Sequence, residues 1–146
     1  MSTESESSHV CESNESVHNL ECDYLVIGAG ATGLAFVDEL IHGSRNIKVI
    51  LVDKRAKPGG NWVDAYSFVR LHQPAALYGV NSKVLGNGGA DLASKSQILA
   101  YYELVVEDLK ATGRLCYYPQ CEYLGNGQFN SLLGDGITYH VRFSLT

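Results

Sequence analysis

The chain has 146 residues, of which 45% are hydrophobic and 18% charged, the composition of an ordinary globular domain. Residues 1–23 hold six of its 16 acidic residues and no lysine or arginine, so the remainder is close to neutral. A neutral domain lacks the basic stripe of a nucleic-acid-binding protein, and no apolar run approaches the roughly 20 residues of a membrane-spanning helix. We therefore expect no nucleic-acid partner and no membrane partner.

Residues 1–20 consist largely of serine, glutamate, asparagine and histidine, with little apolar surface to bury. This composition predicts a disordered acidic tail. An acidic, serine-rich start differs from the basic and then apolar start of a signal peptide, so we expect a cytoplasmic protein. His9, Cys11 and His18 lie in the tail, but an unfolded segment cannot pre-organise metal ligands, and we expect no metal site.

Residues 24–27 are an apolar run that predicts a strand buried on both faces, in the middle of a parallel sheet. The spaced glycines that follow are typical of a nucleotide-binding turn. Gly28 allows the chain to leave the strand sharply, Gly30 lets a pyrophosphate approach the backbone, and Gly33 permits close helix–strand contact. The N–H groups of a helix that begins near Ala31 would face the phosphates. The predicted phosphate site comprises Gly28, Gly30, Ala31, Thr32 and Gly33.

The context of these glycines supports a strand–helix–strand unit. Leu34, Val37 and Ile41 give the helix one apolar stripe, and residues 47–52 form a second predicted strand.

Asp53 ends that strand, twenty residues after Gly33, where an acidic residue of such a unit accepts hydrogen bonds from an adenosine ribose. The alternative interpretation is a turn aspartate at the strand end. Lys54 and Arg55 suggest a different ligand, because basic residues at this position could hold a 2′-phosphate. The acid at the strand end argues against a phosphate in the same place.

A second glycine-rich loop follows, Pro58-Gly59-Gly60-Asn61-Trp62. Its glycines give the backbone the freedom to lie against a bound cofactor, although Trp62 read alone is equally a core aromatic. Residues 63–82 fit neither a helix nor a strand, and a cofactor against their surface would explain a long irregular connection.

The last part of the chain predicts one helix and then short strands. Ser94 and Gln97 can form a capping box, and the following apolar face ends at Gly113. Short β segments separated by turns then predict a small antiparallel meander, namely residues 115–118, 121–124, 128–133 and 137–143. The four cysteines lack zinc-type spacing and are expected to be free thiols.

Together, the glycine fingerprint, Asp53, the Gly59–Trp62 loop and residues 66–70 resemble the N-terminal FAD-binding part of the flavin-containing monooxygenase superfamily. That superfamily includes Baeyer–Villiger and N-hydroxylating enzymes and uncharacterised FAD/NAD(P)-binding relatives. The resemblance covers residues 21–146 and implies an α/β fold, with a Rossmann-type parallel sheet, helices and the small antiparallel β-meander. Residues 21–146 would then be one FAD-binding domain, and an incomplete one.

The resemblance also implies a set of cofactor-binding residues. Arg70 falls where the family tends to have an arginine, and His72 stands where Baeyer–Villiger enzymes often carry an aspartate near the flavin. His72 is either a polar flavin neighbour or a structural histidine. The implied set is Gly28, Gly30, Ala31, Thr32, Gly33, Asp53, Lys54, Gly60, Asn61, Trp62, Arg70 and His72; no catalytic residue is identified.

Disulfide reductases share this fold, and Cys116 and Cys121 have a spacing seen in their redox pair. In those enzymes the cysteines directly follow the glycine loop, whereas here both lie beyond the long predicted helix. This position argues against a reductase.

The sequence has no second glycine fingerprint for NADPH. We therefore expect the chain to be the N-terminal portion of an FAD-binding oxidoreductase of the monooxygenase type, which acts on a small-molecule substrate. We expect this portion to be inactive by itself. NADPH would be a co-substrate only with the missing domain present. The alternatives are a non-catalytic nucleotide-binding module from a truncated gene, or an NAD(P)-binding protein. An incomplete domain would also expose apolar surface, so we expect self-association.

Overall fold

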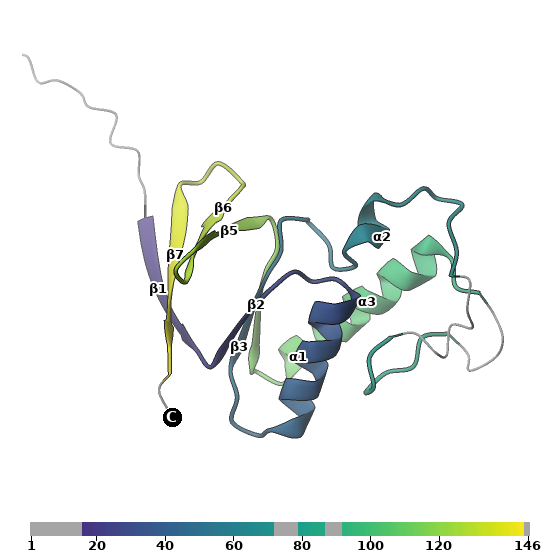
Figure 1. The fold of residues 1–146 in the computed structure, drawn as a ribbon, viewed down its shortest axis with the longest axis horizontal. Helices are drawn as coiled ribbons and strands as arrows, with labels where there is room; N and C mark the ends of the chain where they lie inside the picture. Colours follow the sequence, from purple (N-terminus) through teal and green to yellow (C-terminus); the bar gives the residue numbers. More distant parts are fainter. Residues whose placement is uncertain (1–15, 72–78, 87–91, 145–146) are drawn as a thin grey trace, which may run out of the picture.

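The computed structural model describes residues 16–71, 79–86 and 92–144. Its helices and one parallel sheet form an α/β unit, and a second sheet lies against that unit (Figure 1). The elements in chain order are β1 (Ser16–Cys22), β2 (Tyr24–Ile27), α1 (Ala31–Gly43), β3 (Val49–Val52), α2 (Asn61–Asp64), α3 (Lys95–Ala111), β4 (Leu115–Tyr118), β5 (Cys121–Gly125), β6 (Gln128–Ser131) and β7 (Ile137–Phe143).

The parallel sheet has the order β2-β3-β4, with β3 at its centre. All four residues of β3 are buried, because both faces of this strand are covered. Val49 and Leu51 pack into the core beneath α1 and α3, whereas Ile50 and Val52 pack into a second core beneath the other sheet. The predicted α/β fold is confirmed.

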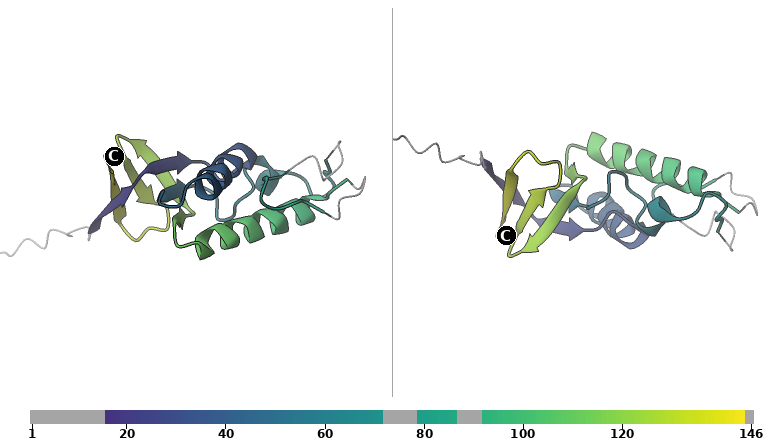
Figure 2. Two further views of the ribbon diagram at one scale, coloured as in Figure 1. Left: turned by 90° about the horizontal axis from the view of Figure 1, so that it is seen from below. Right: turned by 90° about the horizontal axis from the view of Figure 1, so that it is seen from above.

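Helix α3 begins at the predicted capping box. The Ser94 hydroxyl accepts a hydrogen bond from the Gln97 backbone N–H, and the Gln97 side chain accepts one from the Ser94 N–H. Its buried face, with Ile98, Tyr102 and Leu109, lies in the same core as Leu34 and Val37 of α1. Seen from below and above, α1 and α3 lie to one side of the molecule and the second sheet to the other (Figure 2).

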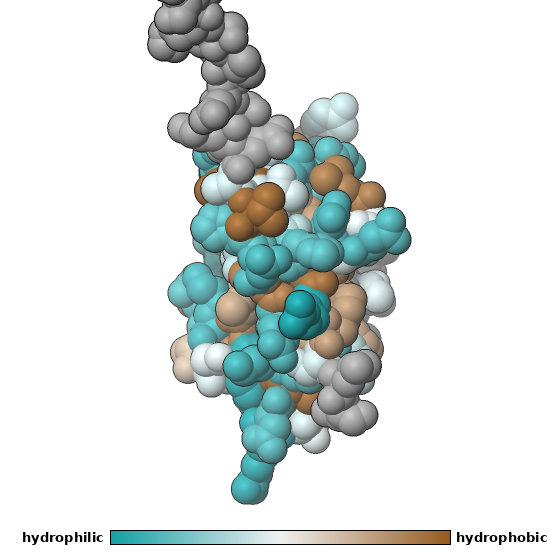
Figure 3. Space-filling model, turned by 90° about the vertical axis from the view of Figure 1, so that its left-hand side faces the viewer, coloured by the Kyte–Doolittle hydropathy of each residue, from teal (hydrophilic) through white to brown (hydrophobic). Residues whose placement is uncertain are grey.

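The second sheet has the order β1-β7-β6-β5, and its outer face carries mostly hydrophilic side chains with separate apolar patches (Figure 3). Strands β5, β6 and β7 pair antiparallel, as predicted for the meander. The prediction was wrong about residues 115–118: β4 pairs in parallel with β3 and belongs to the first sheet. Four short β segments in succession do not show which sheet each one joins, because that depends on contacts with distant strands.

The prediction that the tail extends to residue 20 was also wrong. Residues 16–20 belong to β1, which pairs in parallel with β7 from Ser16–Ile137 to Cys22–Phe143. Most side chains of β1 are exposed, so their composition resembles that of a tail, and backbone hydrogen bonds to β7 hold the strand instead. Residues 1–15 lie outside the described residues.

The apolar run of β2 predicted a strand in the middle of the sheet, and this prediction was wrong. Among the described residues its only neighbour is β3, and Tyr24 and Ile27 are 41% and 49% exposed. The apolar run correctly indicates a strand, but the number of its neighbours depends on the rest of the fold.

Candidate functional site

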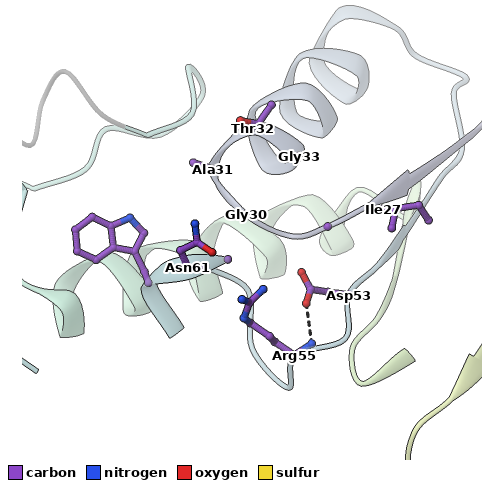
Figure 4. Close-up of a pocket in the computed structure, with 12 residues that line it drawn as sticks. Ile27, Gly30, Ala31, Thr32, Gly33, Asp53, Arg55 and Asn61 are labelled. Carbon is purple, nitrogen blue, oxygen red and sulfur yellow. Dashed lines mark hydrogen bonds between the residues drawn. The ribbon is translucent and has the colours of Figure 1, made fainter. Parts of the chain in front are cut away.

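A cavity of about 420 Å³ lies where the first turn of α1, the end of β3 and the start of α2 meet (Figure 4). Its volume is within the usual range of small-molecule sites. It is lined by Ile27, Gly28, Gly30, Ala31, Thr32, Gly33, Asp53, Arg55, Gly59, Gly60, Asn61 and Trp62. The topology therefore brings together nine of the twelve residues that the sequence assigned to cofactor binding.

The first turn of α1 presents its backbone to this cavity. Gly30 is the N-cap residue, so no side chain caps the helix, and no acidic residue lies in the first turn. The first helical hydrogen bond runs from the Leu34 N–H to the Gly30 carbonyl. The preceding N–H groups, with the positive end of the helix dipole, are suited to an anion.

Gly33 allows close contact between α1 and the turn after β2. A Cβ atom at this position would lie 2.0 Å from the Gly28 carbonyl oxygen, a distance that no side chain can tolerate. Gly28 itself has a φ of +104°, in the region that glycine adopts readily. The tight strand-to-helix turn therefore requires both glycines.

The two glycine-rich loops lie in direct backbone contact. The Gly59 N–H donates to the Ala29 carbonyl at 2.8 Å, and a Cβ atom on Gly60 would lie 2.9 Å from the Gly30 Cα atom. A Cβ atom on Gly30 would in turn point at Gly60, 3.5 Å from its Cα atom. The sequence related Gly30 only to a phosphate, and the structure adds this contact between the loops.

The second glycine loop leads into α2, a single helical turn that the sequence did not predict because glycine and proline dominate the segment. Asn61, at the start of α2, and Arg55, from the loop after β3, both face the turn that precedes α1 (Figure 4). Opposite the helix N-terminus, the cavity therefore carries an amide and a guanidinium.

Asp53 is buried, only 5% exposed, at the junction of the two sheets. Its Oδ2 atom accepts a hydrogen bond from the Ala29 N–H at 2.6 Å, and its Oδ1 atom accepts one from the Arg55 N–H at 2.7 Å. Both carboxylate oxygens are therefore engaged by backbone groups of the site.

The basic residues after Asp53 are paired with acids. Arg55 donates through Nε and Nη2 to Asp64 Oδ2, at 2.9 and 2.7 Å, and this hydrogen bond raises the pKa of Arg55 above its ordinary value. Lys54 Nζ lies 3.3 Å from Glu122 Oε1 in β5. Each positive charge at the end of β3 thus has a negative partner.

A second cavity of about 290 Å³ adjoins the first and shares Ile27, Gly28, Asp53 and Arg55 with it. Val52, Lys54, Cys121 and Tyr123 complete its lining, which is mainly apolar. Burial raises the pKa of the Cys121 thiol. Sequence reasoning missed Cys121 and Tyr123 as site residues, because no local pattern shows that β5 passes the end of β3.

Of the three remaining predicted residues, the two that the structure describes, Lys54 and Arg70, lie apart from the main cavity. Lys54 lines only the second cavity. The Arg70 guanidinium donates to the Leu92 carbonyl at 3.2 Å, near the start of α3, and is absent from the lining of both cavities. His72 lies outside the described residues. Ile27, Arg55 and Gly59 also line the main cavity but were not in the implied set. The sequence had related Arg55 to a 2′-phosphate and Gly59 to a loop against the cofactor, whereas no sequence signal pointed to Ile27.

The described part of the chain contains neither a cluster of potential metal ligands nor a helix that could span a membrane. In that part, no three His, Cys, Asp or Glu side chains group as metal ligands would. None of its helices has both the length and the apolar character needed to cross a membrane.

Residues 26–80 match the family described as the NAD(P)-binding Rossmann-like domain. The chain is 49% identical to an uncharacterised protein of Mycobacterium tuberculosis (strain ATCC 25618 / H37Rv), in an alignment that covers 79% of the chain and 23% of the relative. An uncharacterised protein of Mycobacterium bovis (strain ATCC BAA-935 / AF2122/97) matches with the same values. The chain thus spans 23% of the length of these curated relatives.

Solved structures share the fold. A flavin-containing monooxygenase from Stenotrophomonas maltophilia superposes with a TM-score of 0.60 at 21% identity, covering 84% of this chain and 37% of that one. A bacillithiol disulfide reductase from Staphylococcus aureus superposes with a TM-score of 0.62 at 15% identity, covering 87% and 39%. A cyclohexanone monooxygenase gives 0.55 at 20% identity, covering 86% and 26%.

Proposed function

We propose that this chain binds FAD, because residues 26–80 match the NAD(P)-binding Rossmann-like domain and the fold is shared with flavin monooxygenases and a disulfide reductase. It would do so as the dinucleotide-binding portion of a monooxygenase-type oxidoreductase. The observation that carries the proposal is the backbone contact between the two glycine loops at one cavity, from Gly59 to Ala29 and from Gly60 to Gly30.

The cavity suits a pyrophosphate and its two substituents. The uncapped first turn of α1 offers N–H groups to the phosphates without a carboxylate in that turn to repel them. On one side, Ile27, Val52 and Tyr123 offer apolar surface to an adenine. On the other side, we assign the path toward the flavin ring to Gly60, Asn61 and Trp62.

The charges beside Asp53 favour FAD over NADPH. A 2′-phosphate would have to compete with Glu122 for Lys54 and with Asp64 for Arg55. FAD has no 2′-phosphate, so it would not have to break these pairs. This observation argues against the alternative of an NADP-binding protein. The second candidate function is a module that binds a dinucleotide without catalysis, because no catalytic residue is assigned to the cavity.

When bound, FAD supplies the redox and oxygen chemistry of such enzymes, and the protein supplies binding, orientation and electrostatics. In this chain the α1 turn and the second glycine loop would fix the dinucleotide. Arg55, held by Asp64, would keep a positive charge beside it. A small-molecule substrate, NADPH as a co-substrate and a cytoplasmic location are part of the same proposal. No described residue is assigned to any of them.

The test is the purification of the chain with added FAD, followed by desalting and an absorbance spectrum. We expect the two bands of oxidised flavin in the protein fraction. A parallel titration followed by tryptophan fluorescence should show that FAD binds more tightly than NADPH, since Trp62 is the single tryptophan of the chain and lines the cavity.

A suitable control is Lys110→Gln, because Lys110 lies in the last turn of α3, outside both cavities. Its affinity for FAD should equal that of the parent chain. Saturable NADPH binding without flavin uptake would refute the proposal and favour the NAD(P)-binding alternative.

A further inference from the structure

The feature that carries a further inference is the ion pair between Lys54, which follows the buried Asp53, and Glu122 of β5. Lys54 lines the second cavity together with Asp53, and its Nζ atom lies 3.3 Å from Glu122 Oε1. Glu122 itself lines neither cavity. A residue of the second sheet therefore neutralises a cation that borders the proposed ribose site.

Backbone hydrogen bonds fix the start of β5 beside Lys54. The Cys121 N–H donates to the Asp53 carbonyl at 2.9 Å, and the Gln120 N–H donates to the Arg55 carbonyl at 3.1 Å. These two bonds bracket Lys54 in the sequence, so the residue that follows Cys121 lies close to the lysine. The ion pair is therefore a consequence of how the two sheets join.

Of the two cations after Asp53, Lys54 is the one that a single substitution can release. Arg55 donates two hydrogen bonds to Asp64 Oδ2, at 2.9 and 2.7 Å, and it also lines the main cavity. The Lys54 and Glu122 side chains are 69% and 41% exposed. An exposed pair of this kind contributes little to stability, so Glu122 can be replaced without loss of the fold.

We propose that Glu122 is a specificity-determining residue: by holding the Lys54 ammonium group, it keeps that cation from binding a 2′-phosphate on the adenosine ribose, and so disfavours 2′-phosphorylated dinucleotides. The inference rests on the proposed function, because it concerns the adenosine end of the same site. It leaves Asp53 able to accept a ribose hydroxyl, since a carboxylate accepts more hydrogen bonds than the two that Asp53 receives from the backbone.

The experiment compares 5′-AMP with adenosine 2′,5′-bisphosphate, two ligands that differ only in a 2′-phosphate, by calorimetric titration of the chain. The measured quantity is the ratio of their dissociation constants, which partial unfolding would not change. Glu122→Gln keeps the size of the side chain and removes its charge. It should tighten binding of the bisphosphate by about 3- to 10-fold. The affinities for 5′-AMP and FAD should stay close to those of the parent chain.

A double variant tests whether Lys54 is responsible for this effect. Lys54→Gln combined with Glu122→Gln removes both charges of the pair, so the net charge equals that of the parent chain. If the released lysine binds the 2′-phosphate, the double variant should return to the affinity ratio of the parent chain.

The matched control is Glu103→Gln, which removes the acidic group of another exposed ion pair. Glu103 Oε1 lies 3.9 Å from Lys57 Nζ, and neither residue lines either cavity. The net charge of the chain changes by the same amount as in Glu122→Gln, so this variant measures the effect of charge alone. Its affinity ratio should equal that of the parent chain.

Any of three results would overturn the inference. An unchanged ratio in Glu122→Gln would mean that Lys54 does not bind a 2′-phosphate even when it is released. An equal rise in Glu103→Gln would indicate a general effect of charge, and a rise that persists in the double variant would assign the effect to another cation. A parent chain that binds neither 5′-AMP nor FAD would instead refute the proposed function, a result distinct from all three.

Discussion

At the scale of single residues, the site depends mainly on where side chains are absent. Gly33 and Gly60 lie so close to neighbouring backbone that a Cβ atom would be 2.0 Å from the Gly28 carbonyl oxygen in one case and 2.9 Å from the Gly30 Cα atom in the other. These contacts bring the helix N-terminus, the end of β3 and the second loop around one cavity. The glycines therefore serve the packing of the site as well as access for a phosphate.

Gly33→Ala should lower the free energy of unfolding by about 3 kcal/mol, because backbone must shift to accommodate the new methyl group. Gly43→Ala, at the last residue of the same helix, is the control, since a Cβ atom there meets nothing within 4 Å. It should change stability by less than about 1 kcal/mol. Urea unfolding followed by circular dichroism measures both, and equal stability of the two variants would contradict the packing role of Gly33.

At the scale of elements, β2 is the strand whose environment differs most from its sequence pattern. Its partner on one side is β3, and no described strand pairs with its other edge. Tyr24 in β2 contacts Phe36 of α1 edge to face, with ring centroids 6.1 Å apart, and Phe36 is 48% exposed. An open strand edge beside exposed aromatic side chains is a known route to association between chains.

We therefore predict that the purified chain self-associates with a second copy as its concentration rises. Phe36→Glu should shift the sedimentation profile toward the monomer, because it places a charge on the apolar surface beside β2. Leu133→Glu is the control, since Leu133 is 63% exposed in the turn between β6 and β7. A parent chain that stays monomeric at every concentration would contradict the prediction, as would an equal effect of both variants.

At the scale of the whole molecule, two cores lie on opposite faces of the parallel sheet. The first joins the sheet to α1 and α3, and the second joins Ile50 and Val52 to the β1–β7 sheet. The second core also contains ionisable groups. Burial raises the pKa of the Cys22 thiol from 9.0 to about 11, and burial likewise raises the pKa of Tyr118 above its ordinary value.

These shifts predict a loss of stability in alkali. Because the folded state holds the Cys22 proton up to about pH 11 while the unfolded chain releases it near 9, the stabilisation is complete below pH 9 and is lost as pH rises through 11. The thiol should account for about 2–3 kcal/mol of this loss. Urea unfolding at pH 8 to 11 measures it, and Cys22→Ala should flatten the decline, whereas Cys116→Ala, at an exposed cysteine, should not. An unchanged slope in Cys22→Ala would contradict the assignment.

The sequence by itself determined the local features of this protein. The glycine spacing from Gly28 to Gly33 predicted the strand–turn–helix, Ser94 and Gln97 predicted the start of α3, and the turns after residue 121 predicted the antiparallel strands. Each of these depends on backbone preferences or hydrogen bonds between residues close in sequence, so a local pattern contains the necessary information.

Only the tertiary structure decided which distant segments meet. In the structure β4 belongs to the parallel sheet, and residues 16–20, which were predicted to be part of the tail, pair with β7. Among the described strands, β2 lies at the edge of its sheet. The Asp53 carboxylate accepts a hydrogen bond from the N–H of Ala29, a residue 24 positions earlier in the chain. Strand order and the partner of a buried carboxylate are set by contacts between segments far apart in sequence, and hydrophobic periodicity within one segment carries no information about them.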